Sequence, residues 1–143
     1  MPVFAFTAGS LGDILATIGL TAQVVQVLYD HRNITHECET LAMELRSLQQ
    51  VLILTDVALQ KYESTALGQP LVDFIRPEVA QCHILLQQFS SKVQSCRQAL
   101  TRTTISTLWR RVVWAASDEA LSLSANLSGH RLKLVLLLMS LNS

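Results

Sequence analysis

The chain has 143 residues, of which 50% are hydrophobic and only 15% are charged, and its formal net charge is zero. This length suits one domain with a core of its own, and a neutral chain with few bases is a poor match to nucleic-acid binding. The charged fraction lies below the roughly 25% of an ordinary soluble domain, so we expect apolar surface to be hidden in a core, a partner or a membrane.

The charges are divided unevenly along the chain. Residues 1–75 carry eight acidic and three basic side chains, whereas residues 76–143 carry eight basic and three acidic ones. Either the two halves attract each other within one fold or between copies, or the basic half forms a face for anionic lipid. The cysteines Cys38, Cys82 and Cys96 include no C-x-x-C pair, which favours a reducing compartment over a disulfide framework or a zinc site.

The first predicted helix spans residues 10–30 and has no charge between Asp13 and its last residue. A helix that is apolar nearly all round lies either at the centre of a bundle or in contact with lipid. The small residues Ala8, Gly12 and Ala16 form a row that indicates tight packing in a bundle or self-association in lipid. The expected apolar stripe of this helix is Leu11, Ile14, Leu15, Ile18, Ala22, Val25 and Tyr29.

Two further long helices are predicted over residues 35–63 and 71–101. Each has apolar residues at alternating steps of three and four, a pattern typical of helices that pack along one another. Pro77 lies inside the second pattern, where it would either kink the helix near Asp73 or begin a new segment, and the unbroken phase of the stripe favours one kinked helix. The first stripe is Cys38, Leu41, Leu45, Leu48, Leu52, Thr55, Leu59 and Tyr62, widened by Val51, Leu54 and Ala58. The second stripe is Val72, Ile75, Val79, Cys82, Leu86, Phe89, Val93, Cys96 and Leu100.

The rest of the chain is expected to form a short helix over residues 105–115 and a final helix over residues 118–141 that Ser117 caps. From Leu132 onward the final helix is apolar nearly all round, which favours a place in the middle of the bundle. The pattern predicts an all-α fold, an antiparallel bundle of four long helices and one short one. One stripe of the final helix is Leu121, Ala125, Ser128, Leu132, Val135 and Met139, and the other is Leu123, Leu127, Leu134, Leu137, Leu138 and Leu141.

The sequence contains no catalytic or metal-binding pattern. It has no Gly-rich phosphate loop, no G-x-S-x-G and no H-E-x-x-H, and its histidines are scattered. Cys82 and His83 are adjacent and therefore diverge on a helix, which indicates a core cysteine and a histidine at the rim. We therefore expect no catalytic residue, no metal ion and no cofactor, and an enzyme or a carrier of an apolar ligand is disfavoured.

Two tryptophans flank a pair of arginines in the sequence WRRVVW, which begins at Trp109. Tryptophan beside Arg110 and Arg111 suits a membrane interface, and Arg110 can stack on Trp114. The alternative is a short helix whose tryptophans close one end of the bundle. Together with Arg102, these four side chains are the candidates for contact with a membrane surface or a partner.

Four segments carry a resemblance to a known family: AGSLGDILATIGL, ECETLAMELRSLQQVL, LGQPLVDFI with VAQCHILLQQF, and LWRRVVWAASDEALSLSANLSGHRLKLVLLL. Together they resemble the HeLo and HeLo-like N-terminal domains of fungal STAND-type immune receptors and related basidiomycete proteins. The resemblance covers nearly the whole chain and rests on helix order and apolar patterning. It implies a helical bundle similar to the executioner domain of the necroptosis pseudokinase and to the cell-death domains of plant immune receptors.

The resemblance also implies a function. The chain would be a membrane-targeting, pore-forming cell-death domain of innate immunity or allorecognition, in which copies assemble and the first helix then enters the bilayer. The expected partners are anionic membrane lipid, further copies of the chain and a downstream receptor or regulatory domain. The inserting residues would be Leu11, Ile14, Leu15, Ile18 and Leu20.

The expected location is the cytoplasm, with recruitment to the membrane on activation. Because members of the family carry further regions after this domain, residues 1–143 are expected to be a single bundle domain excised from the N-terminus of a larger protein. The alternative function is a helical interaction or oligomerisation module without membrane activity.

Overall fold

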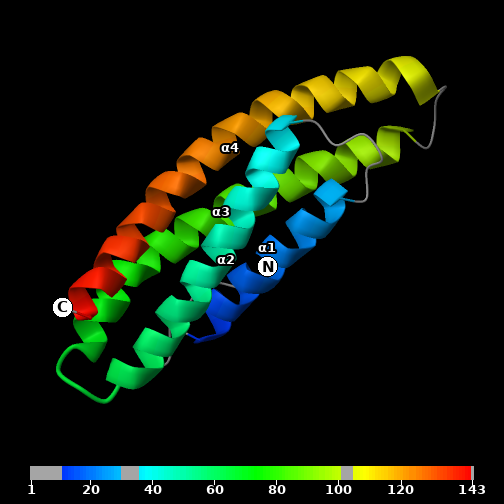
Figure 1. The fold of residues 1–143 in the computed structure, drawn as a ribbon. Coiled ribbons are helices and arrows are strands. Elements are labelled where there is room, and N and C mark those ends of the chain that lie inside the picture. The colour runs from blue at the N-terminus through cyan, green and yellow to red at the C-terminus, as the bar shows by residue number, and fades with distance from the viewer. Residues whose placement is uncertain (1–10, 30–35, 101–104, 143) are drawn as a thin grey trace.

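The computed structural model describes residues 11–29, 36–100 and 105–142, and the side chains of residues 11, 96–100 and 105–117 lie outside this description. The described chain forms four helices, which are α1 (Leu11–Tyr29), α2 (His36–Tyr62), α3 (Gly68–Leu100) and α4 (Ile105–Leu141). They lie side by side with their axes roughly aligned (Figure 1). The predicted all-α bundle is confirmed.

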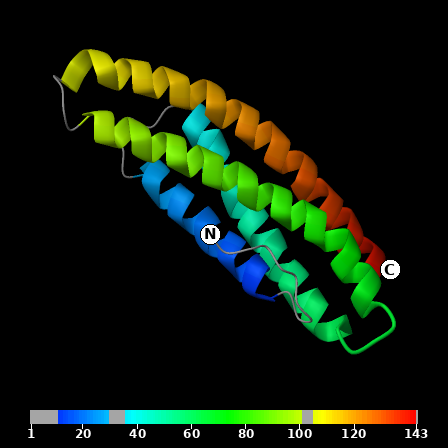
Figure 2. The same cartoon turned by 180° about the vertical axis from the view of Figure 1, so that it is seen from behind.

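The helices alternate in direction, but chain neighbours are not always neighbours in space. Helix α1 packs against α2 and α3, and α4 packs on the same two helices from the opposite side. Among the described residues α1 and α4 make no contact, and α2 meets α3 only sparsely. The bundle therefore has α1 diagonal to α4, and its parallel pairs are α1 with α3 and α2 with α4 (Figures 1 and 2).

Helix α3 continues through Pro77, so the expectation of one helix rather than two is confirmed. A tight link over residues 63–67 leads into it from α2. The Thr65 hydroxyl donates to the carbonyl of Tyr62 at 2.7 Å and accepts from the amide of Leu67 at 3.2 Å. A Cβ atom on Gly68 would lie 2.7 Å from a carbonyl oxygen of this link, so the close approach of the chain requires glycine there.

The prediction of a separate short helix before the final helix is wrong. Residues 105–115 and 118–141 belong to one helix of 37 residues, α4. Ser117 therefore lies within a helix rather than capping one. Neither Gly nor Pro occurs between Ile105 and Ser128, so nothing in this stretch imposes a break on the backbone.

The core lies along the axis of the bundle and draws on all four helices. Six of the residues predicted for α2 and five of those predicted for α3 are buried in it. Leu54, which was expected to widen the α2 stripe, is 56% exposed. The side chains of Cys96 and Leu100 lie outside the described residues, and the remaining predicted residues are partly buried, namely Cys38, Val51, Ala58, Tyr62, Val72 and Val93. The confirmed residues are Leu41, Leu45, Leu48, Leu52, Thr55, Leu59, Ile75, Val79, Cys82, Leu86 and Phe89.

Helix α4 packs at a corner of the bundle and not in its middle. Of its two apolar stripes only the second faces the core, through Leu123, Leu127 and Leu134. The first stripe faces outward, and Leu132 is 50% exposed. The prediction of a central final helix is wrong because the spacing of its apolar residues supports two faces and the bundle covers only one of them.

Candidate functional site

Helix α1 turns a partly polar face towards the core. Its buried residues are Ile14, Thr17, Thr21, Val24 and Leu28, which follow alternating steps of three and four. The stripe predicted from apolar residues alone is therefore misplaced, because it contains only one of these five. The buried set has the same period as the stripes of α2 and α3. A search for this period that treated threonine as apolar would have identified the buried face.

Each buried threonine of α1 binds a carbonyl of its own helix. The Thr17 hydroxyl donates to the carbonyl of Asp13 at 2.9 Å, and the Thr21 hydroxyl donates to that of Thr17 at 2.7 Å. Such a bond satisfies the hydroxyl locally, so a threonine of this kind can be buried without any partner from another helix. This explains why threonine takes positions that the other helices fill mainly with leucine.

Thr17 also contacts α3 through the imidazole of His83. The hydroxyl oxygen lies 3.1 Å from His83 Nδ1, and both residues are buried. The prediction of a rim histidine is therefore wrong, although Cys82 is a core residue as expected. Burial lowers the pKa of His83 from its ordinary value of 6.5, and the charge of Asp13 partly opposes this shift.

Asp13 completes a polar cluster between α1 and α3. Burial raises the pKa of its carboxyl group, and the charges of His83 and Arg76 act in the opposite direction. Its Oδ2 atom has no hydrogen-bond partner among the described residues. The cluster of Asp13, Thr17, Arg76 and His83, here called the α1/α3 cluster, holds α1 through groups that would otherwise be hydrated.

The outer face of α1 carries small residues and one large apolar side chain. Leu15 is 55% exposed. Gly12, Ala16 and Gly19 are exposed as well, and a Cβ atom on either glycine would meet nothing within 4 Å. The expectation that the row of small residues from Ala8 to Ala16 packs tightly in the bundle therefore fails for Gly12 and Ala16, and Ala8 lies outside the described residues.

The five candidate inserting residues do not share one environment. Ile14 is fully buried in the core, so its proposed contact with lipid requires movement of α1. Leu15 is exposed, and Ile18 and Leu20 are partly buried against the core. Leu11 begins α1, and its side chain lies outside the described residues.

Four of the five candidate surface residues lie at the far end of the α3/α4 hairpin. Trp109, Arg110, Arg111 and Trp114 belong to α4, and their side chains lie outside the described residues, as does the whole of Arg102. This end of the hairpin projects beyond α1 and α2 (Figure 1). Stacking of Arg110 on Trp114 stays a prediction.

One described helix is long and apolar enough to cross a membrane. It is α1, in which the 18 residues Gly12–Tyr29 have a mean hydropathy of 1.3. Only 28% of this segment is buried in the bundle. A helix at the centre of a soluble fold would be mostly buried, so α1 combines a composition suited to lipid with the exposure of a surface helix.

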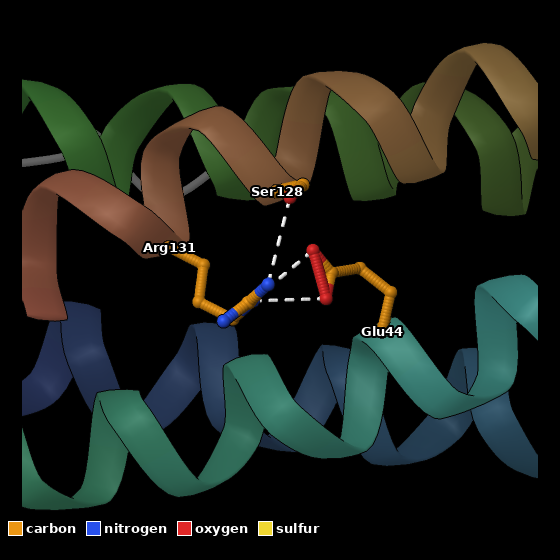
Figure 3. Close-up of polar contacts among 3 residues, drawn as sticks. All are labelled: Glu44, Ser128 and Arg131. Atoms are coloured by element: carbon orange, nitrogen blue, oxygen red, sulfur yellow. Dashed lines mark hydrogen bonds and ion pairs between the residues drawn. The ribbon is translucent and has the colours of Figure 1, made fainter.

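On the opposite side, α2 and α4 are tied by an ion pair. Arg131 Nε donates to both carboxylate oxygens of Glu44, at 2.9 and 3.1 Å, and the guanidinium also approaches the Ser128 hydroxyl at 3.5 Å (Figure 3). The Glu44 side chain is only 10% exposed. The pair lies in an open groove of about 590 Å³ whose walls include Met43 of α2 and Leu121 of α4.

Glu78 of α3 binds two bases of α4. It contacts His130 Nδ1 at 2.5 Å and Lys133 Nζ at 3.4 Å. Of the ion pairs seen among described residues, only Glu44–Arg131 joins the acidic first half of the chain to the basic second half. The charges of Asp13 and Arg76 also attract each other between α1 and α3, so the two halves of the chain attract each other at both α2/α4 and α1/α3.

Large apolar side chains are exposed along the outside of α2 and α4. We call this set the α2/α4 face, and each of its members is between 48% and 68% exposed. Its lower part borders a second groove of about 230 Å³, where Leu54 and Val57 meet Leu138 and Leu141. The face consists of Met43, Leu54, Val57, Leu121, Leu132, Leu136 and Met139.

Comparisons with models of known protein families, with curated proteins and with solved structures found no match to this chain. The resemblance to HeLo-like domains stays a prediction.

Proposed function

We propose that this chain is a membrane-engaging effector domain, in which α1 enters anionic lipid after copies of the bundle assemble. The observation that carries the proposal is that α1 has the length and hydropathy of a membrane span and yet is only 28% buried. A pore-forming role in cell death and innate immunity is the form of this activity that the HeLo-like resemblance implies. The domain would act from the cytoplasm and move to the membrane on activation.

The contacts of α1 support its release from the bundle. Part of what α1 buries is hydroxyl rather than hydrocarbon, so leaving the core sacrifices less apolar contact than the sequence of the helix suggests. The α1/α3 cluster gains hydration when it separates, which offsets some of the lost packing. Among the described residues α4 makes no contact with α1, so its packing on α2 and α3 can persist when α1 moves.

The same hydrogen bonds suit α1 to lipid. A polar group in the hydrocarbon region must find its partner within the protein, because no water is present there. The hydroxyls of Thr17 and Thr21 already bind carbonyls of their own helix and would retain these bonds in a bilayer. Asp13 lies in the first turn of α1, where a charged group can stay at the level of the headgroups.

The proposal is tested by dye release from phosphatidylserine-containing vesicles. Leu15→Glu places a charge on the outer face of α1 at a position that is 55% exposed, so the variant should fold normally and lose at least about tenfold in release rate. Phe74→Glu is the matched control, because Phe74 is 45% exposed on α3 and the change is of the same kind. Circular dichroism confirms the folding of both variants. Equal release by folded Leu15→Glu and the unchanged chain refutes insertion of α1.

A second function has a specific observation in its favour. The α2/α4 face leaves seven large apolar side chains at least 48% exposed, which is typical of a protein–protein interaction surface. A module that acts only by binding protein would show this face without any activity on vesicles. Dye release that stays at the background level for the unchanged chain would favour this alternative.

A further inference from the structure

We infer that the α2/α4 face is the surface through which two copies of this chain pack against each other. This inference names the contact that assembles the copies and rests on residues other than those of α1. It therefore stands or falls separately from the insertion of α1 into lipid. Its starting point is the wrong prediction for α4, whose first apolar stripe is exposed although it is as regular as the buried one.

The exposed apolar side chains of α4 lie on one side of that helix, which borders α2 through two grooves. Leu132, Leu136 and Met139 follow one another at steps of four and three, so they share a face of α4. Leu121 lies three turns before Leu132 on the same side of α4. It lines the groove around the Glu44–Arg131 pair together with Met43 of α2. Nearer the end of α4, the second groove is lined by Leu54 and Val57 of α2 and by Leu138 of α4.

The size of the face matches the requirement for a stable contact. Half-exposed side chains of leucine or methionine each present on the order of 100 Å², so the seven together present roughly 700 Å². The largest apolar patch of an ordinary monomer is about 300–600 Å², whereas a stable protein–protein contact covers about 800 Å² on each partner. The α2/α4 face exceeds the first range and approaches the second value, which favours burial against another protein.

The electrostatics favour a second copy over a partner of different sequence. None of the seven side chains is charged, and the nearby Glu44 and Arg131 satisfy each other within the chain. A two-fold contact brings each residue close to its own copy, so any exposed charge on such a face would meet a like charge. Because no member of the face is charged, such repulsion is confined to its border, where the exposed Lys61 lines the groove beside Leu54 and Val57, and the face offers little to steer a strongly charged partner.

The shape of the face also allows it to pack on itself. A two-fold interface requires that one surface carry both the projections and the hollows. Here Leu136 and Met139, each 63% exposed, project from α4, while the grooves between α2 and α4 provide the hollows. A dimer built in this way leaves the outer face of α1 uncovered, because α1 lies diagonally opposite α4.

Sedimentation equilibrium of the full chain over micromolar to near-millimolar concentrations tests the inference. The unchanged chain should show a monomer–dimer equilibrium, and Leu136→Glu and Met139→Glu should each raise the dissociation constant by about tenfold or more. Leu15→Glu is the matched control, with a similar exposure of 55% on α1, and it should dimerise like the unchanged chain. Thermal unfolding verifies that the variants remain folded.

Three results would overturn the inference. One is an unchanged chain that is monomeric at every concentration, and another is unaltered association of both α4 variants. The third is an equal loss of association in Leu15→Glu, which would place the contact on α1. A monomer whose α4 variants lose vesicle binding would assign the face to lipid instead. If the dimer is absent while Leu15→Glu still abolishes dye release, the inference fails and the proposed function of α1 stands.

Discussion

Thr17 and Thr21 lie one turn apart on the buried face of α1, and we expect their replacement by valine to change stability in opposite directions. Both side chains are fully buried, and both donate to a carbonyl of their own helix. Of these two hydroxyls, only that of Thr17 lies within hydrogen-bond distance of a described residue on another helix, because it is 3.1 Å from Nδ1 of buried His83. The same change of one hydroxyl to one methyl group therefore meets two different surroundings.

The magnitudes follow from what each change removes. In Thr21→Val a methyl group replaces the hydroxyl, which is worth about 0.8 kcal/mol in burial, and the lost bond to Thr17 is a local one worth about 0.5 kcal/mol or less. The free energy of unfolding should rise by about 0.5 kcal/mol. Thr17→Val also removes the contact with His83, and the desolvation cost of the imidazole then lowers the free energy of unfolding by about 1–2 kcal/mol.

Urea unfolding followed by circular dichroism measures both changes against the unchanged chain. If α1 must leave the core before it enters lipid, Thr21→Val should also release dye from vesicles more slowly, by about twofold, and Thr17→Val should release it faster. Shifts of the same sign for the two variants, or a loss of more than about 1 kcal/mol in Thr21→Val, would refute the account of the α1/α3 cluster.

Three further predictions concern other parts of the bundle. Burial lowers the pKa of His83, so below about pH 6.5 the unfolded chain binds a proton at this residue that the folded chain does not. The free energy of unfolding should therefore fall as the pH decreases below about 6.5. His83→Gln should reduce this pH dependence when the free energy of unfolding is measured at several pH values. In thermal melts, Gly19→Ala should stabilise by about 1 kcal/mol because its Cβ meets open space, whereas Gly68→Ala should destabilise because a Cβ there lies 2.7 Å from a carbonyl oxygen. Glu44→Gln should lower the free energy of unfolding by about 1–2 kcal/mol, because Arg131 is then partly buried without an opposite charge. Glu119→Gln breaks an exposed pair with Lys92 and should lower it by less than about 0.5 kcal/mol. Urea titration measures both changes.

The fold could be predicted from the sequence where one apolar stripe dominates a helix. In α2 the stripe from Leu41 to Leu59 is leucine-rich and has polar neighbours, so the residues that the helical period selects are the ones that are buried. In α4 two stripes of equal quality compete, and periodicity cannot say which one the other helices cover. The stripe with Leu123 is buried and the stripe with Leu132 is exposed. That choice is made by tertiary packing.

The candidate site was harder to predict because its polar residues behave in context-dependent ways. Threonine is apolar in effect when its hydroxyl binds a carbonyl one turn earlier, as in Thr21, and no apolar count registers this. Adjacent residues diverge on a helix, so local spacing predicts His83 at the rim beside the core residue Cys82, whereas its contact with Thr17 spans 66 positions of the chain. A contact at such a separation leaves no trace in local spacing.

The diagonal arrangement of α1 and α4 also has a consequence for the order of folding. The antiparallel neighbours α1 with α2 and α3 with α4 are each consecutive in the chain, so each pair can form as a hairpin from local contacts. The parallel contacts, which include Thr17 with His83 and Glu44 with Arg131, all lie between these two hairpins. We expect the hairpins to collapse first and to dock afterwards about the link at residues 63–67. Core substitutions within a hairpin should then slow folding, whereas loss of the Glu44–Arg131 pair should chiefly accelerate unfolding.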